Sequence, residues 1–280
     1  MRLVYLGTPA MAVPPLRALA GAGHQIDLVV TRADARRGRG GQQSPSPVKA
    51  AARDLGLSVS HDVDDVLAAA AEGAQLGVVV AFGQIIKPHV LAALPMVNLH
   101  FSLLPRWRGA APVERALLAG DDVTGVCVMA VEEGLDTGGV YARAEVPIGP
   151  ETTATDLRER LVAVGTELLV AQLAQPLETW IDRPQPQAGE PTYAAKLTPA
   201  DFEIDWDGPV EHIYRQIRVG GAWTTFRGRR LKILSAELTD GVLLPRQVQP
   251  EGKGPMAFDD WRRGARPAAG ELFGDPPGPS

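Results

Sequence analysis

The sequence of 280 residues predicts an α/β protein with an open, mostly parallel sheet and a second, smaller domain. An apolar run at 2–6 precedes a segment that begins with Pro14 and Pro15, and a second apolar run follows at 25–31. This strand–helix–strand order is typical of a right-handed crossover in a parallel sheet. Residues 76–82 are almost wholly apolar, which indicates a strand buried on both faces. We therefore expect a sheet of Rossmann-like topology.

Local signals place the elements of the first domain. Ser46 can cap a helix whose first residue is Pro47, and Thr153 with Asp156 resembles a capping box ahead of an amphipathic helix. No GxGxxG pattern follows the first strand, so a dinucleotide site is not expected. The sequence predicts strands at 2–6, 25–31, 57–60, 76–82, 97–101, 123–131 and 140–146, helices from Pro14, at 47–55, 64–71, 112–119 and 153–174, and a long polar loop at 32–47.

Proline and glycine mark the border between two domains. We expect a catalytic domain at 1–176 and an extended linker at 177–195, where Pro184, Pro186 and Pro191 lie. A shortened, incomplete barrel-like domain follows at 196–264, with a helix at 210–217, strands at 223–225 and 231–238, and a loop at 247–256. Residues 265–280 are rich in proline and glycine and are predicted to be a disordered tail.

Composition excludes several classes of protein. The single cysteine, Cys127, excludes an internal disulfide framework and a cysteine-rich metal site, and no metal is expected. No apolar run reaches membrane-spanning length and the N-terminus does not resemble a signal peptide, so we expect a cytoplasmic protein with no membrane partner.

The charge distribution says more than the net charge of −5. Between 215 and 232 the chain carries only basic charges, which can attract phosphates locally. The alternative is a solvated strand edge whose charges resist aggregation. The basic residues of this stretch are Arg215, Arg218, Arg227, Arg229, Arg230 and Lys232.

Two side chains at the end of the strand at 97–101 form a candidate chemical pair. Strand residues alternate between faces, so Asn98 and His100 point the same way. An asparagine can donate to a developing oxyanion and a histidine can move a proton near neutral pH. Asp136, in a turn-rich loop downstream, could fold back and orient the imidazole. From spacing alone, a structural Asn-x-His pair and a turn aspartate are the commoner outcomes.

A longer motif favours the catalytic interpretation of these residues. The run NLHFSLLPRWRGAAP at 98–112 resembles the signature of folate-dependent formyltransferases, and the similarity extends from the first residues to about Gly264. Shorter pieces of the same pattern occur in order at Gly7-Thr8-Pro9, Gly38-Arg39-Gly40, 44–49 (SPSPVK), 135–138 (LDTG) and 249–253 (QPEGK).

The resemblance implies a formyltransferase fold and the transfer of a formyl group from 10-formyltetrahydrofolate to the α-amine of initiator methionyl-tRNA. It assigns His100 to proton transfer, Asn98 to the oxyanion, and Asp136 to fixing His100. It also implies folate-binding residues and tRNA-binding residues. The former are Phe82, Gly83, Gln84, Ile85, Ser102, Leu103, Leu104 and Pro105, and the latter are Arg36, Arg37, Arg39, Arg227, Arg229 and Arg230.

The chain departs from the family pattern in two places. Gly41-Gln42-Gln43 stands where the family usually has lysines, and the stretch between Leu238 and Gln247 is shorter by about a dozen residues, roughly two strands. Other acceptors therefore stay open, namely glycinamide ribonucleotide or an amino sugar. So do a formyltetrahydrofolate hydrolase and a low-turnover RNA- or folate-binding relative. We expect a monomer.

Overall fold

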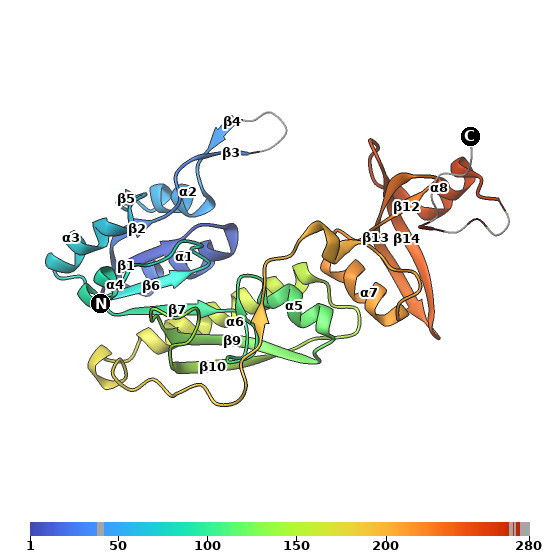
Figure 1. Cartoon of the computed structure of the whole chain (residues 1–280). Helices are drawn as coiled ribbons and strands as arrows, with labels where there is room; N and C mark the ends of the chain where they lie inside the picture. Colours follow the sequence, from blue (N-terminus) through green and yellow to red (C-terminus); the bar gives the residue numbers. More distant parts are fainter. Residues whose placement is uncertain (38–41, 269–270, 272, 275–280) are drawn as a thin grey trace. The chain divides into compact units, whose positions relative to one another are not determined.

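The chain divides into two compact units in the computed structural model, which describes residues 1–37, 42–268, 271 and 273–274 (Figure 1). Unit 1 comprises Met1–Pro112, Val123–Pro147 and Arg158–Ala195, and unit 2 comprises Val113–Asp122, Ile148–Leu157 and Lys196–Ser280. Two short segments that we expected in the first domain, 113–122 and 148–157, thus group with unit 2. The segment 177–195, expected as a linker, groups with unit 1.

A seven-stranded, mostly parallel sheet forms the centre of unit 1, which confirms the predicted fold class. The strand order is β10-β9-β7-β6-β1-β2-β5; β7, β6, β1, β2 and β5 run parallel, while β9 and β10 are antiparallel to their neighbours. The strands are β1 (Arg2–Gly7), β2 (Gln25–Val30), β5 (Val59–Ser60), β6 (Leu76–Val80), β7 (Met96–His100), β9 (Val123–Ala130) and β10 (Val140–Pro147).

Helices bury the apolar strands of this sheet. Every residue of β6 is buried, as the unbroken apolar run predicted. Val66 and Val90, from α3 and α4, pack in one cluster with Val4 of β1 and Val30 of β2. The helices of the first part of the chain are α1 (Val13–Gly21), α2 (Pro47–Asp54), α3 (Val66–Ala71), α4 (Pro88–Ala93), α5 (Pro112–Ala119) and α6 (Ala154–Leu173), and the 3-10 turns are η1 (Ala10–Ala12), η2 (Val63–Asp65) and η3 (Leu177–Thr179).

Two predicted helix caps are confirmed. The Ser46 hydroxyl accepts a hydrogen bond from the backbone N–H of Lys49 at 2.9 Å, at the start of α2. At the start of α6, Asp156 accepts from the backbone N–H of Thr153 and the Thr153 hydroxyl accepts from that of Asp156. No helix in the described part of the chain has the length and apolar character needed to cross a bilayer.

The polar segment at 32–47 contains a short hairpin, β3 (Ala35–Arg37) and β4 (Gln42–Ser44), where the sequence predicted only a loop. Lys49 of α2 ties its base to the rest of unit 1. The buried Lys49 ammonium donates to Asp34 Oδ1 at 2.6 Å and lies 3.1 Å from His61 Nε2. This hydrogen bond, followed by the positive charges around it, holds the pKa of the Asp34 carboxyl below its ordinary value.

Replacing Asp34 by asparagine should lower the melting temperature at neutral pH and weaken its dependence on acid. A carboxylate whose pKa is depressed by folding stabilises the fold above its unfolded-state pKa, and the contribution is lost as the pH falls through the folded-state pKa. The difference in Tm between Asp34→Asn and the wild type should therefore shrink below about pH 4. Circular dichroism melts across pH measure this, with Asp54→Asn, which breaks an exposed 3.4 Å pair with Arg17, as control.

Unit 2 is built on a small antiparallel sheet with the order β12-β13-β14-β15. Among the described residues β12 and β15 do not pair, so the sheet is open, as the shortened sequence predicted. Ile213 and Ile217 of α7 pack on Leu231 and Ile233 of β13, and Trp261 of α8 joins them. The elements are η4 (Pro199–Phe202), α7 (Val210–Val219), β12 (Trp223–Phe226), β13 (Arg229–Thr239), β14 (Val242–Pro250), β15 (Met256–Ala257) and α8 (Phe258–Ala265).

The loop predicted at 247–256 is wrong in its first part, because Gln247–Pro250 end strand β14. The strand was not predicted because it contains two prolines, which are rare inside strands. Pro245 pairs with Ala236 where the register of β13 and β14 shifts, and such irregularities tolerate a missing N–H. Within the segment predicted as a disordered tail, Phe273 stacks on Trp206 with 5.1 Å between ring centroids. Residues 269–270, 272 and 275–280 of that segment lie outside the described residues.

Candidate active site

Asn98 and His100 stand on the same face of β7, at its carboxyl end. In the register with β9, Asn98 pairs with Met129 and His100 with Cys127. The His100 side chain is buried, with 5% of the residue exposed, whereas Asn98 is partly exposed. Within the described residues the Asn98 amide makes no hydrogen bond to the protein, so it can donate to a bound substrate. Asn98 is also the only asparagine in the sequence.

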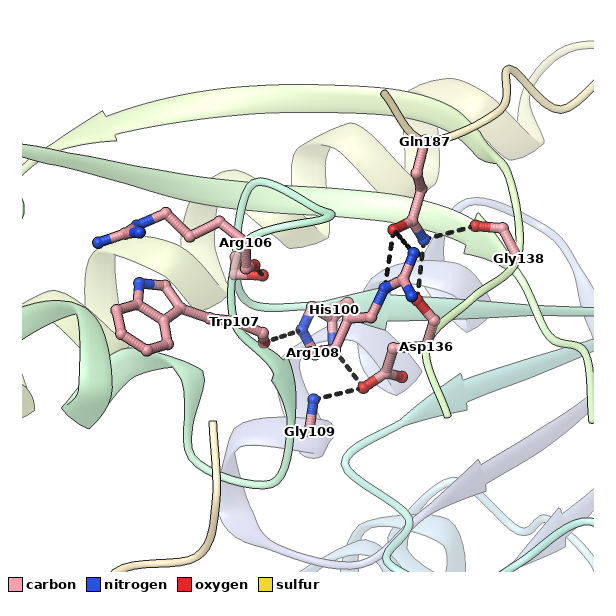
Figure 2. A network of polar contacts seen from close by, with 9 residues as sticks. His100, Arg106, Trp107, Arg108, Gly109, Asp136, Gly138 and Gln187 are labelled. Carbon is pink, nitrogen blue, oxygen red and sulfur yellow. Dashed lines mark hydrogen bonds and ion pairs between the residues drawn. The ribbon is translucent and has the colours of Figure 1, made fainter. Parts of the chain in front are cut away.

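The ring of His100 is held between two oxygens (Figure 2). Its Nε2 lies 2.9 Å from the carbonyl oxygen of Trp107, and its Nδ1 lies 3.6 Å from Asp136 Oδ2. A carbonyl only accepts, so Nε2 carries the proton of the neutral ring and Nδ1 keeps its lone pair. Nδ1 is therefore the nitrogen that can take up a proton, and the Asp136 carboxylate lies beside the positive charge the ring would acquire.

Asp136 lies in the loop between β9 and β10, and its carboxylate is fixed by the segment that follows β7. Its Oδ2 accepts a hydrogen bond of 2.7 Å from the backbone N–H of Gly109. Its backbone has φ of 51°, a left-handed conformation in which aspartate is enriched. Gly138 permits the loop to lie close to β9, because a Cβ at this position would be 2.0 Å from the Ala130 carbonyl oxygen. The LDTG pattern thus has a steric reason as well as a chemical one.

Gln187 is a site residue that the sequence analysis missed. Its amide nitrogen donates to the carbonyl oxygens of Asp136 and Gly138, both at 2.8 Å. Its amide oxygen accepts two hydrogen bonds from the Arg108 guanidinium, at 3.0 and 2.6 Å (Figure 2). It lies in the proline-rich stretch expected as a linker. No signal in the sequence identifies it, because its partners are distant along the chain.

The segment 177–195 also contacts the loop that follows β7. The Thr192 hydroxyl accepts from the backbone N–H of Trp107 at 2.9 Å. Next to it, a two-residue parallel pair joins β8 (Arg108–Gly109) to β11 (Tyr193–Ala194). Gly109 has φ of 120°, and a Cβ there would lie 2.9 Å from the Ala194 carbonyl oxygen, so this close approach requires glycine.

Cys127 is a buried free thiol on β9, and burial raises its pKa. A thiol held in its neutral form is a poor nucleophile and metal ligand. In the described ranges no three or more histidine, cysteine, aspartate or glutamate side chains are grouped so that they could hold a metal ion.

The residues expected at the folate lie at two strand exits of unit 1, and several of their side chains are buried. Phe82 packs in the core cluster with Val4 and Val30, and Leu104 packs with Cys127 and Met129. These residues can offer a ligand only backbone groups. Ser102 is buried and donates to the Arg106 carbonyl at 2.6 Å. The exposed positions of the set are Gly83, Gln84 and Ile85, and Ile85 is 89% exposed.

The arginines expected at the tRNA lie in two separate segments of the chain. Arg36 and Arg37 lie in β3, and Arg39 lies outside the described residues. In unit 2, Arg227 is bound by Glu271 at 2.5 and 2.8 Å; this ion pair raises the pKa of Arg227 and lowers that of Glu271 to about 2. Arg230 lies over the ring of Trp223 at 3.9 Å.

The arginines expected at the tRNA in unit 2 line one groove of about 610 Å³. Its cationic lining comes from Arg227, Arg229, Arg230 and Lys253, and its acidic lining from Glu251 and Asp260. Because Glu271 already neutralises Arg227, the positive charges left to bind an anion here are those of Arg229, Arg230 and Lys253.

The chain matches two domain families along most of its length. Residues 1–173 match the formyl transferase family and residues 196–241 match the formyl transferase C-terminal domain. A methionyl-tRNA formyltransferase of Jannaschia sp. is 42% identical, over 98% of this chain and 100% of the relative. One of Dinoroseobacter shibae is 47% identical, over 86% of this chain and 84% of the relative.

Solved structures show the same fold. A methionyl-tRNA formyltransferase from Clostridium thermocellum matches 91% of this chain and 100% of its own, with a TM-score of 0.60 at 17% identity. An N-formyltransferase from Helicobacter canadensis, in complex with folinic acid and dTDP-3-aminofucose, matches 85% of this chain and 88% of its own, with a TM-score of 0.66 at 19% identity. The family matches, the near full-length relatives and the shared fold lead to one conclusion: the chain belongs to the formyl transferase family.

Proposed function

We propose that the chain transfers the formyl group of 10-formyltetrahydrofolate to the α-amine of initiator methionyl-tRNA, a step of translation initiation. One observation carries this proposal. His100 has one nitrogen bound to the Trp107 carbonyl and the other facing Asp136, on the strand that also presents the amide of Asn98. The near full-length similarity to methionyl-tRNA formyltransferases supports this acceptor.

In the proposed reaction the amine nitrogen bonds to the formyl carbon while the bond from that carbon to N10 of the folate breaks, the amine loses a proton and N10 gains one. His100 Nδ1 takes the proton that the amine loses. Trp107 keeps the proton on Nε2, and Asp136 lies 3.6 Å from the nitrogen that becomes charged. Asp136 thus orients the base and stabilises its charged form.

Asn98 acts on the other atom whose charge changes. Negative charge develops on the formyl oxygen as the amine attacks, and a preorganised N–H donor stabilises it. The Asn98 amide shares the face of β7 with His100, so the base and the oxyanion donor reach one substrate carbon from the same strand.

The formyl donor is proposed to bind at the exits of β6 and β7, at the carboxyl edge of the parallel sheet where α/β proteins bind ligands. Gly83, Gln84 and Ile85 are exposed there and can contact the ring system. Phe82, Leu104 and Ser102 are buried and contribute by shaping the two segments, while Leu103 and Pro105 are partly exposed.

Removing Arg229 and Arg230 together should raise the KM for tRNA and flatten its dependence on salt. For each phosphate that the variant no longer neutralises, the slope of log affinity against log salt should become shallower by about 0.7–0.9. The folate KM should not change. Steady-state kinetics at several salt concentrations measure both quantities.

The matched control is the double variant Arg227→Ala/Glu271→Ala, which deletes an ion pair in the same groove without changing the net charge. This control should retain the wild-type salt slope. If Arg229→Ala/Arg230→Ala also retained it, unit 2 would not hold tRNA through these charges. Arg36, Arg37 and Arg39 would then be the proposed phosphate-binding residues that remain.

Acceptor competition tests the proposed substrate. Initial rates with 10-formyltetrahydrofolate should be compared for methionyl-tRNA, glycinamide ribonucleotide and a nucleotide-linked amino sugar. The proposal predicts the highest kcat/KM for methionyl-tRNA. A higher value for either small amine would reassign the acceptor, and folate binding without transfer to any amine would favour a binding protein.

A further inference from the structure

The segment 184–194 bonds to two loops, the loop after β7 whose Trp107 carbonyl contacts His100 and the loop that carries Asp136. Gln187 bonds to both loops through one side chain, and Thr192 to one of them. Gln187 is partly buried, and its three partners are groups whose positions determine the site (Figure 2). The stretch expected as a linker therefore contributes a part of the catalytic unit.

Each hydrogen bond of Gln187 fixes a particular piece of the site. Its amide nitrogen binds the carbonyl oxygens of Asp136 and Gly138 and so pins the turn that presents the Asp136 carboxylate. Its amide oxygen binds the Arg108 guanidinium. Arg108 lies between Trp107, whose carbonyl binds His100 Nε2, and Gly109, whose N–H binds the Asp136 carboxylate.

Glutamine suits this position because the position needs both a hydrogen-bond acceptor and a hydrogen-bond donor. A guanidinium only donates and a carbonyl only accepts, so the linking side chain must accept on one atom and donate on another. Asp136 also adopts a left-handed backbone conformation, which needs external contacts to persist. Gln187 supplies two such contacts within the turn.

We infer that Gln187 is a positioning residue, which sets the distance between His100 and Asp136 by clamping the loops that carry their partners. It touches neither substrate and acts through Asp136. The inference deepens the proposed function, on which its kinetic test rests, so a second readout is chosen that needs no substrate.

Kinetics of Gln187 variants test the clamp. Gln187→Leu removes both functions of the amide, and Gln187→Glu keeps an acceptor for Arg108 but loses the donor to the two carbonyls. Both should lower kcat about 10- to 100-fold, since misplacement by about 1 Å costs up to about 100-fold. The folate KM should stay within about twofold. Gln185→Leu is the control, because Gln185 is exposed in the same segment and pairs with Val140 through its backbone.

A double-mutant cycle separates positioning from general loss of structure. If Gln187 acts through Asp136, Gln187→Leu should change kcat by less than about threefold when Asp136 is already alanine, because coupled residues are not additive. The same fold-loss in both backgrounds would overturn the inference. So would a kcat of Gln187→Leu equal to that of Gln185→Leu.

Histidine NMR provides the substrate-free readout. The chain has five histidines, and the ring signal of His100 can be assigned by its loss in His100→Ala. Gln187→Glu should shift the His100 signal, while those of His24, His61, His89 and His212 stay in place. An unmoved His100 signal would overturn the inference. If Gln187→Glu shows the expected shift but the wild type transfers no formyl group, only the proposed function would be overturned.

Discussion

Replacing His100 by alanine should lower kcat for formyl transfer by about 10²–10⁴. In the proposed mechanism the substitution removes Nδ1, the nitrogen beside Asp136 that takes the proton of the amine. KM for both substrates should change much less, because the buried ring faces two protein oxygens and contributes to the reaction rather than to recognition. Rapid-quench kinetics with saturating folate and tRNA measure the chemical step directly.

The control for this variant is His89→Ala. His89 also faces a carboxylate, with its Nε2 3.0 Å from Asp64 Oδ1, but it lies half exposed on the surface. His89→Ala should have the wild-type kcat. A His100→Ala enzyme with near-normal turnover would remove His100 from the mechanism and leave the amine to lose its proton to solvent.

Replacing Asn98 by alanine should lower kcat by about 10²–10³, the cost of losing one oxyanion donor. Asn98→Asp is the sharper variant, because it keeps the size of the side chain and replaces the donor N–H with an oxygen facing the developing negative charge. We expect its kcat to be at least as low as that of Asn98→Ala. Both variants should bind folate normally in equilibrium titrations.

Equal activity of Asn98→Asp and the wild type would contradict the role of the amide as a donor. A loss of folate binding in Asn98→Ala, with an unchanged kcat at saturation, would instead make Asn98 a binding residue. Melting curves of both variants are the control for unfolding, and both should match the wild type.

The sequence predicted those features that depend on neighbouring residues. Ser46 and Thr153 cap their helices through groups three residues away, and such hydrogen bonds are visible in a short window. The unbroken apolar run of β6 identified the buried centre of the parallel sheet. The same-face placement of Asn98 and His100 follows from the period of a strand alone.

Features that depend on distant residues could not be predicted in this way. Gln187 binds Arg108, 79 positions earlier, and its setting among prolines resembles an ordinary linker. Strand β14 was missed because Pro245 and Pro250 argue against a strand in the sequence. In the structure, the shifted register between β13 and β14 accommodates Pro245. The neutralisation of Arg227 by Glu271 joins the basic stretch to a segment expected to be disordered.

The fate of a labelled formyl group tests the central proposal most directly. The protein should be incubated with methionyl-tRNA and 10-formyltetrahydrofolate that carries the label in its formyl carbon. Deacylation of the purified tRNA should then release labelled N-formylmethionine, in an amount equal to the tetrahydrofolate formed. Label found as free formate, with unmodified methionine on the tRNA, would contradict the proposed transfer and identify the chain as a hydrolase.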